Sequence, residues 1–293
     1  MKKLLFVFIV MLMLAGVTSC TVDNDDKHNQ VDPVAESINQ NINSFVSTYA
    51  ADYLKKENEI YTIDYQVLTG LYLLEKSGYN VKVSDFISKE DMQNYVNSLT
   101  YETVNQIFVT SIIDKVYGFE TQKAKDALIK LESVDQWSLT YAYSALKFYG
   151  VNDSLKQEVL SRLTVINPED YRDADYAGMA LAVLSEDEID KTELFNLIKP
   201  NVTVDGITSW GTANACSTSY SIIGLIASGS NLSDYNDAEN LTLIENLLDF
   251  AKDGKFSWEK GGVIDDSFAT PQGFLALVTY KLYNAGAEVV EIF

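Results

Sequence analysis

The residues of this sequence that could carry chemistry are few and of few types. The chain has one histidine, His28, and two cysteines, Cys20 and Cys216, among its 293 residues. A zinc site needs three or four Cys, His or carboxylate ligands, so a lone thiol in a domain without histidine does not supply one. We therefore expect no metal site, an exposed His28 in a polar stretch, and Cys216 as a small buried residue.

Motifs of the common catalytic classes are missing from the sequence. It has no Gly-rich phosphate loop, no GxSxG elbow, no HExxH pair and no EF-hand spacing. The acidic run from Asp23 to Asp26 lacks the glycine and the final glutamate that a calcium loop requires. Tryptophans, tyrosines and aspartates remain as the candidates for a site, and no cofactor is indicated.

The first twenty residues have the zones of a secretory signal. Met1-Lys2-Lys3 is followed by an apolar run from Leu4 to Val17 and then by Thr18-Ser19-Cys20. Val17-Thr18-Ser19-Cys20 resembles the bacterial lipobox, which implies alkylation of the Cys20 thiol by a diacylglyceryl group, with palmitate among the acyl chains, and cleavage that makes Cys20 the new amino terminus. We expect a signal peptide at 1–19 and a lipid anchor on Cys20 that holds the protein to the extracytoplasmic face of the cell membrane. The alternative is ordinary cleavage after Ser19, with Cys20 there by chance.

The segment after the anchor is acidic and polar. Residues 21–32 read TVDNDDKHNQVD and lack apolar periodicity, so we expect a flexible spacer at 20–33 and a domain at 34–293. Removing residues 1–19 leaves 20 basic against 42 acidic residues, a formal charge of −22. Phosphate backbones are bound through Lys and Arg, so nucleic acid is not an expected partner.

Helical periodicity dominates the domain, as in Ile38, Ile42 and Phe45. A weak repeat occurs at 71–78, 111–118, 143–150, 178–185, 222–229 and 274–281, with spacings of 33 to 52 residues between its aligned leucines and isoleucine. Each interval has room for a second, amphipathic helix, as at 123–131, 154–163 and 241–251. The sequence predicts an all-α fold of about six helical hairpins with inner and outer layers. The repeat does not show whether the array closes or forms an open superhelix.

Turn and cap residues mark the ends of these helices. Gly78, Gly150, Gly229 and Gly286 suit the left-handed position after a helix. Small residues inside the repeat, such as Gly178 and Gly224, predict inner helices that approach closely. Candidate N-caps are Ser84, Ser88 and Asp135.

Three segments suggest a family. FSWEKGGVIDDSFATPQGFLALVTYKLY at 256–283, DADYAGMALAVLS at 173–185 and NACSTSYSIIGLIASG at 214–229 resemble the prenyltransferase and squalene-cyclase (terpenoid cyclase) repeat. The resemblance covers about residues 60–285 and implies an α/α toroid. The catalytic motifs of this family's enzymes are mostly missing from the sequence. The Asp, Cys and distant His of the protein prenyltransferase zinc site are matched only by Asn214-Ala215-Cys216. The cyclase acid motif is matched only by Asp265-Asp266, with Val263 in place of an additional Asp.

In a toroid the starts of the inner helices converge, so side chains just before each repeat should line one cavity. This predicts a ligand site made of Tyr65, Gln136, Trp137, Asp173, Asp175, Tyr176, Trp210, Asn214, Trp258, Asp265 and Asp266. Aromatic rings with carboxylates and amides suit a neutral or cationic ligand such as a sugar, a corrinoid or a peptide. The alternatives are that Trp137 and Trp258 pack between the two layers and that Asp265 and Asp266 cap a helix starting near Ser267.

Three functions follow from these features. A non-catalytic ligand-binding or surface interaction module accounts for the anchor, the spacer and the missing catalytic groups. A carbohydrate-active enzyme, a lyase or glycosidase, would use a tyrosine with Asp265 or Asp173 as acid and base. A purely structural surface protein is the third.

Overall fold

The computed structural model describes residues 32–293 except 59, 167–172 and 290–291. The chain divides into two compact units, Met1–Asp32 and Pro33–Phe293, and the second is described here. The predicted signal peptide, Cys20, His28 and nearly all of the predicted spacer lie outside the described residues. Within the described ranges, no helix combines the length and the apolar character that crossing a membrane requires.

The unit from Pro33 is mainly helical, which confirms the all-α class. Its thirteen α-helices among the described residues are α1 (Pro33–Thr48), α2 (Ala50–Tyr53), α3 (Tyr65–Lys76), α4 (Lys89–Ser98), α5 (Val104–Tyr117), α6 (Gln122–Lys130), α7 (Leu139–Tyr149), α8 (Asp153–Leu163), α9 (Ala174–Val183), α10 (Thr192–Ile198), α11 (Ala215–Ala227), α12 (Leu243–Leu248) and α13 (Ala269–Asn284). Short 3₁₀ turns are η1 (Val83–Asp85), η2 (Gln136–Ser138), η3 (Lys199–Asn201) and η4 (Leu232–Tyr235).

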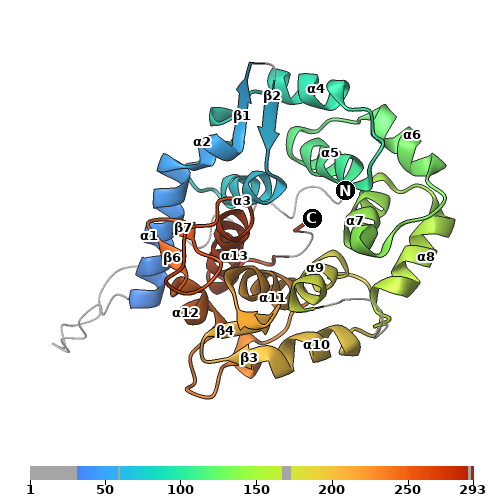
Figure 1. Cartoon of the computed structure of the whole chain (residues 1–293). Coiled ribbons are helices and arrows are strands. Elements are labelled where there is room, and N and C mark those ends of the chain that lie inside the picture. Colours follow the sequence, from blue (N-terminus) through green and yellow to red (C-terminus); the bar gives the residue numbers. More distant parts are fainter. Residues whose placement is uncertain (1–31, 59, 167–172, 290–291) are drawn as a thin grey trace, which may run out of the picture. The chain divides into compact units, whose positions relative to one another are not determined.

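The six repeat segments all fall in or at the end of long helices, namely α3, α5, α7, α9, α11 and α13. Each of these helices contacts the next in that order, and α13 also contacts α3. Figure 1 shows them on the inside of α1, α4, α6, α8, α10 and α12. The burial pattern agrees, because every residue of α11 is buried whereas α8 buries only Leu155, Val159 and Leu163.

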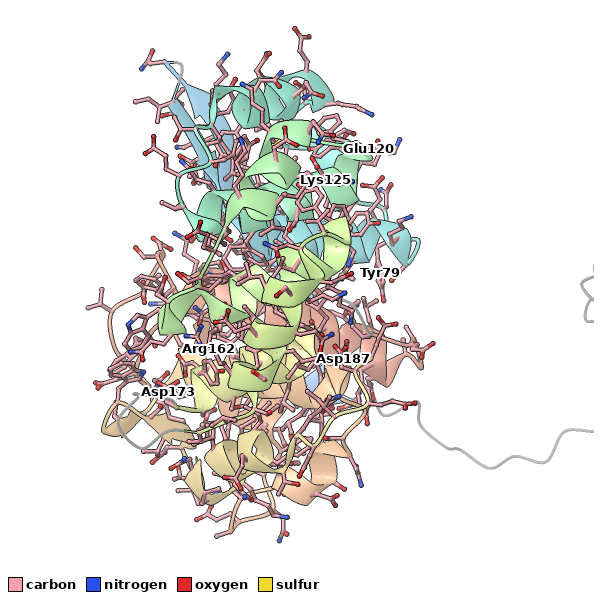
Figure 2. The ribbon with its side chains drawn as sticks, turned by 90° about the vertical axis from the view of Figure 1, so that its right-hand side faces the viewer. Tyr79, Glu120, Lys125, Arg162, Asp173 and Asp187 are labelled. Carbon is pink, nitrogen blue, oxygen red and sulfur yellow. The ribbon has the colours of Figure 1, made fainter. Side chains whose placement is uncertain are left out.

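The inner helices run in the same direction. Tyr79, Glu120 and Asp187 follow the ends of α3, α5 and α9, and Figure 2 shows all three toward one side of the domain. Asp173, which precedes α9, lies on the opposite side. The residues that start the inner helices are therefore brought to a common face.

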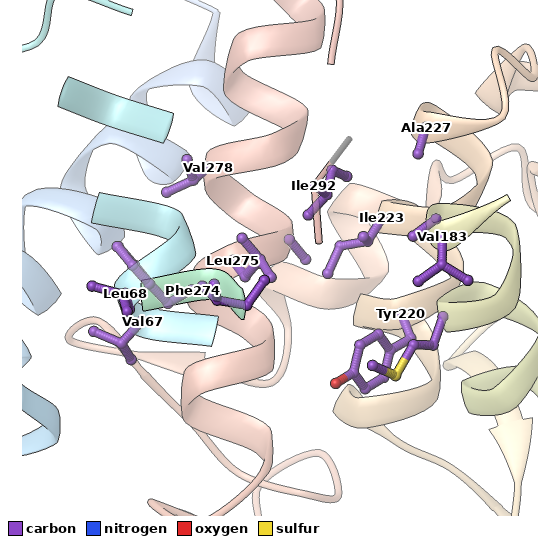
Figure 3. Packing of buried hydrophobic residues seen from close by; sticks show 14 of the residues in the cluster. Val67, Leu68, Val183, Tyr220, Ile223, Ala227, Phe274, Leu275, Val278 and Ile292 are labelled. Carbon is purple, nitrogen blue, oxygen red and sulfur yellow. The ribbon is translucent and has the colours of Figure 1, made fainter. Parts of the chain in front are cut away.

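Close approach between inner helices depends on glycine where α9 meets α11. A Cβ on Gly178 would lie 2.1 Å from the Tyr220 carbonyl oxygen, and a Cβ on Gly224 would lie 2.2 Å from the Gly178 carbonyl oxygen. The backbones touch, as the small residues predicted. On the other side of α11, α13 lies between α11 and α3 and contributes Leu275 and Val278 to the core (Figure 3).

Polar side chains fix several helix ends. Ser88 and Asp135 cap α4 and η2 as predicted, whereas Ser84 lies within η1, so its prediction as a cap was wrong. The buried Asp114 carboxylate of α5 accepts hydrogen bonds from the Thr121 backbone N–H (2.8 Å), the Thr121 hydroxyl (2.7 Å) and the Tyr149 hydroxyl (2.9 Å). One carboxylate thereby joins the end of α5 to the start of α6 and the end of α7.

Short antiparallel strands, which the sequence did not predict, connect some of the helices. They are β1 (Leu54–Glu57) with β2 (Ile60–Ile63), β3 (Val202–Thr203) with β4 (Gly206–Ser209) and β5 (Thr212–Ala213), and β6 (Ala251–Lys252) with β7 (Lys255–Phe256). The β1–β2 pair aligns Leu54 with Ile63, and the β6–β7 pair aligns Ala251 with Phe256.

The β6–β7 turn fastens the first helix to the last part of the chain. The Gly254 backbone N–H donates to Asn41 Oδ1 (3.0 Å), and the Ser44 hydroxyl donates to the Asp253 carbonyl (2.7 Å). Gly254 has a φ of +90°, and a Cβ there would lie 2.6 Å from the Phe45 nitrogen. Only glycine permits this approach of the turn to α1.

Candidate functional site

A cavity of about 410 Å³ opens where the inner helices start. Its lining residues come from α3, α7, α9, α11 and α13 and from the turns that precede them; they are Asp64, Tyr65, Gln66, Gln136, Trp137, Thr140, Tyr141, Asp173, Asp175, Tyr176, Met179, Trp210, Tyr220, Ser267, Phe268 and Gln272. Seven of the residues predicted from the sequence are among them: Tyr65, Gln136, Trp137, Asp173, Asp175, Tyr176 and Trp210. The parallel inner helices bring them together.

Three large aromatic side chains line the cavity and yet are exposed. Trp137 is 62% exposed, Trp210 is 56% exposed and Phe268 is 62% exposed. They belong to η2, to the β4–β5 turn and to the residue before α13, so three separate elements contribute. We call them the aromatic rim. Exposed aromatic surface gathered at a concavity is typical of a site that covers a ligand.

The backbone at Trp210 is unfavourable for its own side chain. Trp210 and Gly211 form a two-residue turn in which both have positive φ, +58° and +89°. Such a turn favours Asn-Gly, and a bulky residue in the left-handed region costs about 1–2 kcal/mol. A tryptophan held in this conformation at the cavity indicates that the site requires it.

A polar cluster forms the base of the cavity. The Tyr65 and Tyr220 hydroxyls are 2.8 Å apart, and the Gln66 amide contacts the Tyr220 hydroxyl at 2.9 Å. One orientation of that amide satisfies all its neighbours: its nitrogen donates to both Asp64 oxygens (3.0 and 3.2 Å), and its oxygen accepts from the two tyrosines. Burial raises the pKa of both tyrosines well above the ordinary value, so they remain neutral donors.

Two carboxyl groups of the cavity, those of Asp64 and Asp175, are buried away from water. Burial raises the pKa of Asp64 to about 6, and the hydrogen bond from the Val67 backbone N–H offsets part of that rise. Burial and then the neighbouring Asp173 carboxylate raise the pKa of Asp175 to about 7. Both values lie near neutral pH, so each group can change its charge when a ligand arrives.

Several buried oxygens of the cavity residues make no hydrogen bond. Asp173 uses Oδ1 to cap α9 by accepting from the Tyr176 N–H (3.0 Å), while its Oδ2 has no partner among the described residues. Asp175 Oδ1 and Gln272 Oε1 also lack a hydrogen bond to the described part of the chain, although the Ser217 side chain is near enough to Asp175 to lower its pKa. Buried polar atoms in proteins are nearly always paired, so these three acceptors indicate where a bound molecule would donate.

Four predicted residues do not line this cavity. Asn214 is fully buried, where its Oδ1 accepts from the Ser217 N–H (2.9 Å) and caps α11. Trp258 is partly buried against the core, as the packing alternative had it. Asp265 accepts from the Ser267 and Phe268 N–H groups (2.9 and 3.1 Å), as the capping alternative had it. Asn214 and Asp265 thus bond to their own helix starts, and Trp258 packs against the core.

Asp266 also lies elsewhere. It pairs with Lys255 Nζ at 2.9 Å and accepts from the Tyr53 hydroxyl at 3.2 Å, in an adjoining depression beside β2 that shares Asp64 and Ser267 with the cavity. An ion pair to the β6–β7 hairpin thus occupies this carboxylate.

Several lining residues were not predicted, namely Asp64, Gln66, Thr140, Tyr141, Met179, Tyr220, Ser267, Phe268 and Gln272. Asp64 had a usable signal, because an aspartate before an apolar helix is a preferred N-cap. Tyr141, Tyr220 and Gln272 lie one turn into their helices, on the face toward the cavity. The prediction stopped at the helix starts and therefore missed them.

The remaining candidate chemistry is sparse. Cys216 is 5% exposed, and burial raises the pKa of its thiol, which fits the small buried residue expected. In the described ranges, no group of three or more His, Cys, Asp and Glu side chains is placed to hold a metal ion. Comparison with protein-family models, with curated proteins and with solved structures finds no match.

Proposed function

We propose that this protein is a lipoprotein, anchored through Cys20 at the extracytoplasmic face of a bacterial membrane, whose domain binds a ligand in the cavity. One observation carries the ligand-binding part: an aromatic rim of Trp137, Trp210 and Phe268 surrounds buried oxygens that lack donors. Exposed aromatic surface and unpaired buried oxygens each destabilise a protein in water, and monomeric proteins seldom keep both at one place unless a ligand covers them.

We also propose that the six inner helices close into an α/α toroid of the prenyltransferase and squalene-cyclase type. The contact of α13 with α3 favours a closed array over an open superhelix, because the end helices of an open array would not meet. The shared direction of the inner helices supports the same arrangement, since it brings the helix starts to one cavity.

The ligand-binding function is tested by thermal shift of the purified protein against panels of oligosaccharides, peptides, corrinoids and amines. A ligand that binds only the folded state raises the unfolding temperature with the logarithm of its concentration. Trp137→Ala and Trp210→Ala should reduce that shift. Phe148→Ala is the matched control, because Phe148 is an aromatic residue, 43% exposed, at the far end of α7. A shift equally reduced in the control, or unaffected in both rim variants, would place binding outside the cavity.

The anchor is tested separately. In a bacterial host the wild-type chain should incorporate labelled palmitate and remain with the membrane fraction, whereas Cys20→Ser should do neither. Labelling that persists in Cys20→Ser would contradict the assignment.

A second candidate function is glycoside hydrolysis, favoured by one observation. Asp64 and Asp175 lie on different elements of the same cavity, and the pKa of each is raised, to about 6 and about 7. A carboxyl with such a pKa can donate a proton at neutral pH while a second carboxylate acts opposite it. Release of nitrophenol from nitrophenyl glycosides, lost in both Asp64→Asn and Asp175→Asn, would support hydrolysis; binding of an oligosaccharide without turnover would exclude it for that ligand.

A further inference from the structure

The unpartnered buried atoms of the cavity share one chemical character. Asp173 Oδ2, Asp175 Oδ1 and Gln272 Oε1 are all acceptors, and no donor lacks a partner among the buried side-chain atoms of the described lining residues. Gln272 is only 7% exposed, so water does not easily replace its missing donor. A ligand that fits these atoms brings N–H or O–H donors and needs few acceptors of its own. This distinguishes it from a sugar, whose hydroxyls donate and accept alike.

The charges of the lining side chains limit the class of ligand further. The lining side chains with a formal charge are Asp64, Asp173 and Asp175, and no lysine or arginine lines the described cavity. Two lysines between α12 and α13 are engaged elsewhere, Lys255 with Asp266 (2.9 Å) and Lys260 with Asp249 (2.9 Å). The described part of the chain thus supplies no cationic side chain to these acidic groups, and a cationic ligand would complement them.

We propose that the cavity recognises a primary ammonium group on a small organic molecule with an apolar body. The inference rests on the proposed ligand-binding function and names its chemical class. An ammonium group donates three N–H hydrogen bonds, and Asp173, Asp175 and Gln272 of the cavity lining each have an oxygen without a donor. The rings of the aromatic rim cover the apolar body and attract the positive charge through their faces.

The titratable carboxyl groups of the cavity make the affinity for an ammonium ligand depend on pH. An ammonium bound beside Asp175 favours its carboxylate, so binding releases a proton from a group whose pKa is about 7 in the free protein. The titratable groups that line the described cavity with Asp175 are Asp64, Asp173, Tyr65, Tyr141, Tyr176 and Tyr220, and the buried Cys216 thiol interacts with Asp175. None of them carries a positive charge, so affinity should increase as pH rises from about 5.5 to 7.5.

The test uses three probes of similar size and measures their affinity for the purified full-length protein by calorimetry at pH 7.5. They are 2-phenylethylamine, its N-trimethylated derivative and 2-phenylethanol. The trimethylated probe keeps the charge but has no N–H donor, and the alcohol has no charge. We expect the amine to bind about tenfold or more tightly than either, because hydrogen bonds to charged groups are the strong ones.

Substitutions test whether the tighter binding of the amine depends on the acceptors of Asp175 and Gln272. Gln272→Leu and Asp175→Asn should each weaken amine binding about tenfold, whereas Asp266→Asn, a carboxylate outside this cavity, should leave it unchanged. Far-ultraviolet circular dichroism and the unfolding midpoint of each variant show that it is folded. Equal binding of the amine and the trimethylated probe, or full affinity in both cavity variants, would overturn the inference.

Failure of this inference is distinguishable from failure of the proposed function. If no amine binds but another ligand gives a thermal shift that Trp137→Ala removes, the cavity is a ligand site of different chemistry. If no ligand in any panel gives a shift that the rim variants reduce, both are wrong.

Discussion

Replacing Asp175 by asparagine should stabilise the protein at neutral and alkaline pH and have little effect in acid. The carboxyl is buried next to Asp173, which raises its pKa from 3.8 to about 7. Since one pKa unit corresponds to about 1.36 kcal/mol, the folded state disfavours the ionised group by at most about 4 kcal/mol. Asparagine has nearly the same shape and carries no charge, so it removes this cost.

The direction in which stability changes with pH follows from the pKa of Asp175 in the unfolded chain, 3.8, and in the folded protein, about 7. Below about pH 4 the group is protonated in both the folded and the unfolded state, and its charge costs nothing. Between about pH 4 and 7 the unfolded chain releases the proton while the folded protein keeps it, so the wild type loses stability as pH rises. Above pH 7 the full cost is present. The difference in unfolding free energy between Asp175→Asn and the wild type should therefore grow with pH and level off above about pH 7.

Urea denaturation at pH 4.5, 6 and 8 measures this difference, with m-values compared to confirm that the same transition is followed. Asp153→Asn is the matched control, because the Asp153 side chain is 84% exposed and its ionisation should contribute little. Asp64 stays in both proteins, so the variant retains some pH dependence below about pH 6. A difference of the same size at pH 4.5 and pH 8 would refute the idea that ionisation of Asp175 is what destabilises the fold.

Three further predictions concern backbone contact, strain and a buried carboxylate. Gly224→Ala should lower the unfolding free energy by about 3 kcal/mol, since its Cβ would lie 2.2 Å from the Gly178 carbonyl oxygen; a loss under about 0.5 kcal/mol would contradict the close contact. Trp210→Asn should raise the unfolding free energy by about 1 kcal/mol while weakening ligand binding, because asparagine tolerates the positive φ; destabilisation would argue against strain at this turn. Asp114→Ala should cost about 3 kcal/mol in urea denaturation, since it leaves the Thr121 N–H and the Tyr149 hydroxyl without their buried acceptor; an unchanged midpoint would show that other groups replace it.

Helical periodicity was enough to find the inner helices of this domain, whereas the predicted outer helix at 241–251 is shorter, since α12 ends at Leu248 and Ala251 starts β6. The repeat segments at 178–185 and 222–229 fall largely in α9 and α11, and the glycines within them mark the place where the two backbones touch. The strands were not predictable in this way, because β3, β5, β6 and β7 have two residues each and leave no alternating pattern. Their turns had the only usable signal. Asp253-Gly254 between β6 and β7 is the Asp-Gly pair typical of a two-residue hairpin, whereas Trp210-Gly211 does not have the usual composition.

Position along the inner helices predicted part of the candidate site. Asp173 and Asp175 line the cavity because α9 starts there, and Asp173 does so although its Oδ1 caps that helix. Asn214, directly before α11, and Asp265, four residues before α13, also accept from backbone N–H groups, and neither lines the cavity. Sequence spacing places all of these residues near the start of an inner helix. It does not show which side-chain oxygens remain without a hydrogen bond and face the cavity.

The contact between α1 and the β6–β7 turn has a consequence for the order of events during synthesis. Asn41 and Ser44 bond to Gly254 and Asp253, more than 200 residues further along the chain. Most of the chain must therefore be synthesised after α1 before α1 meets its partner, and α3 waits over a similar length of chain for α13. Contacts of such long sequence separation slow folding and leave apolar surface uncovered meanwhile. We expect nascent chains truncated before α13 to remain protease-sensitive and to be held by chaperones, and the native fold to appear only once the last inner helix has been released.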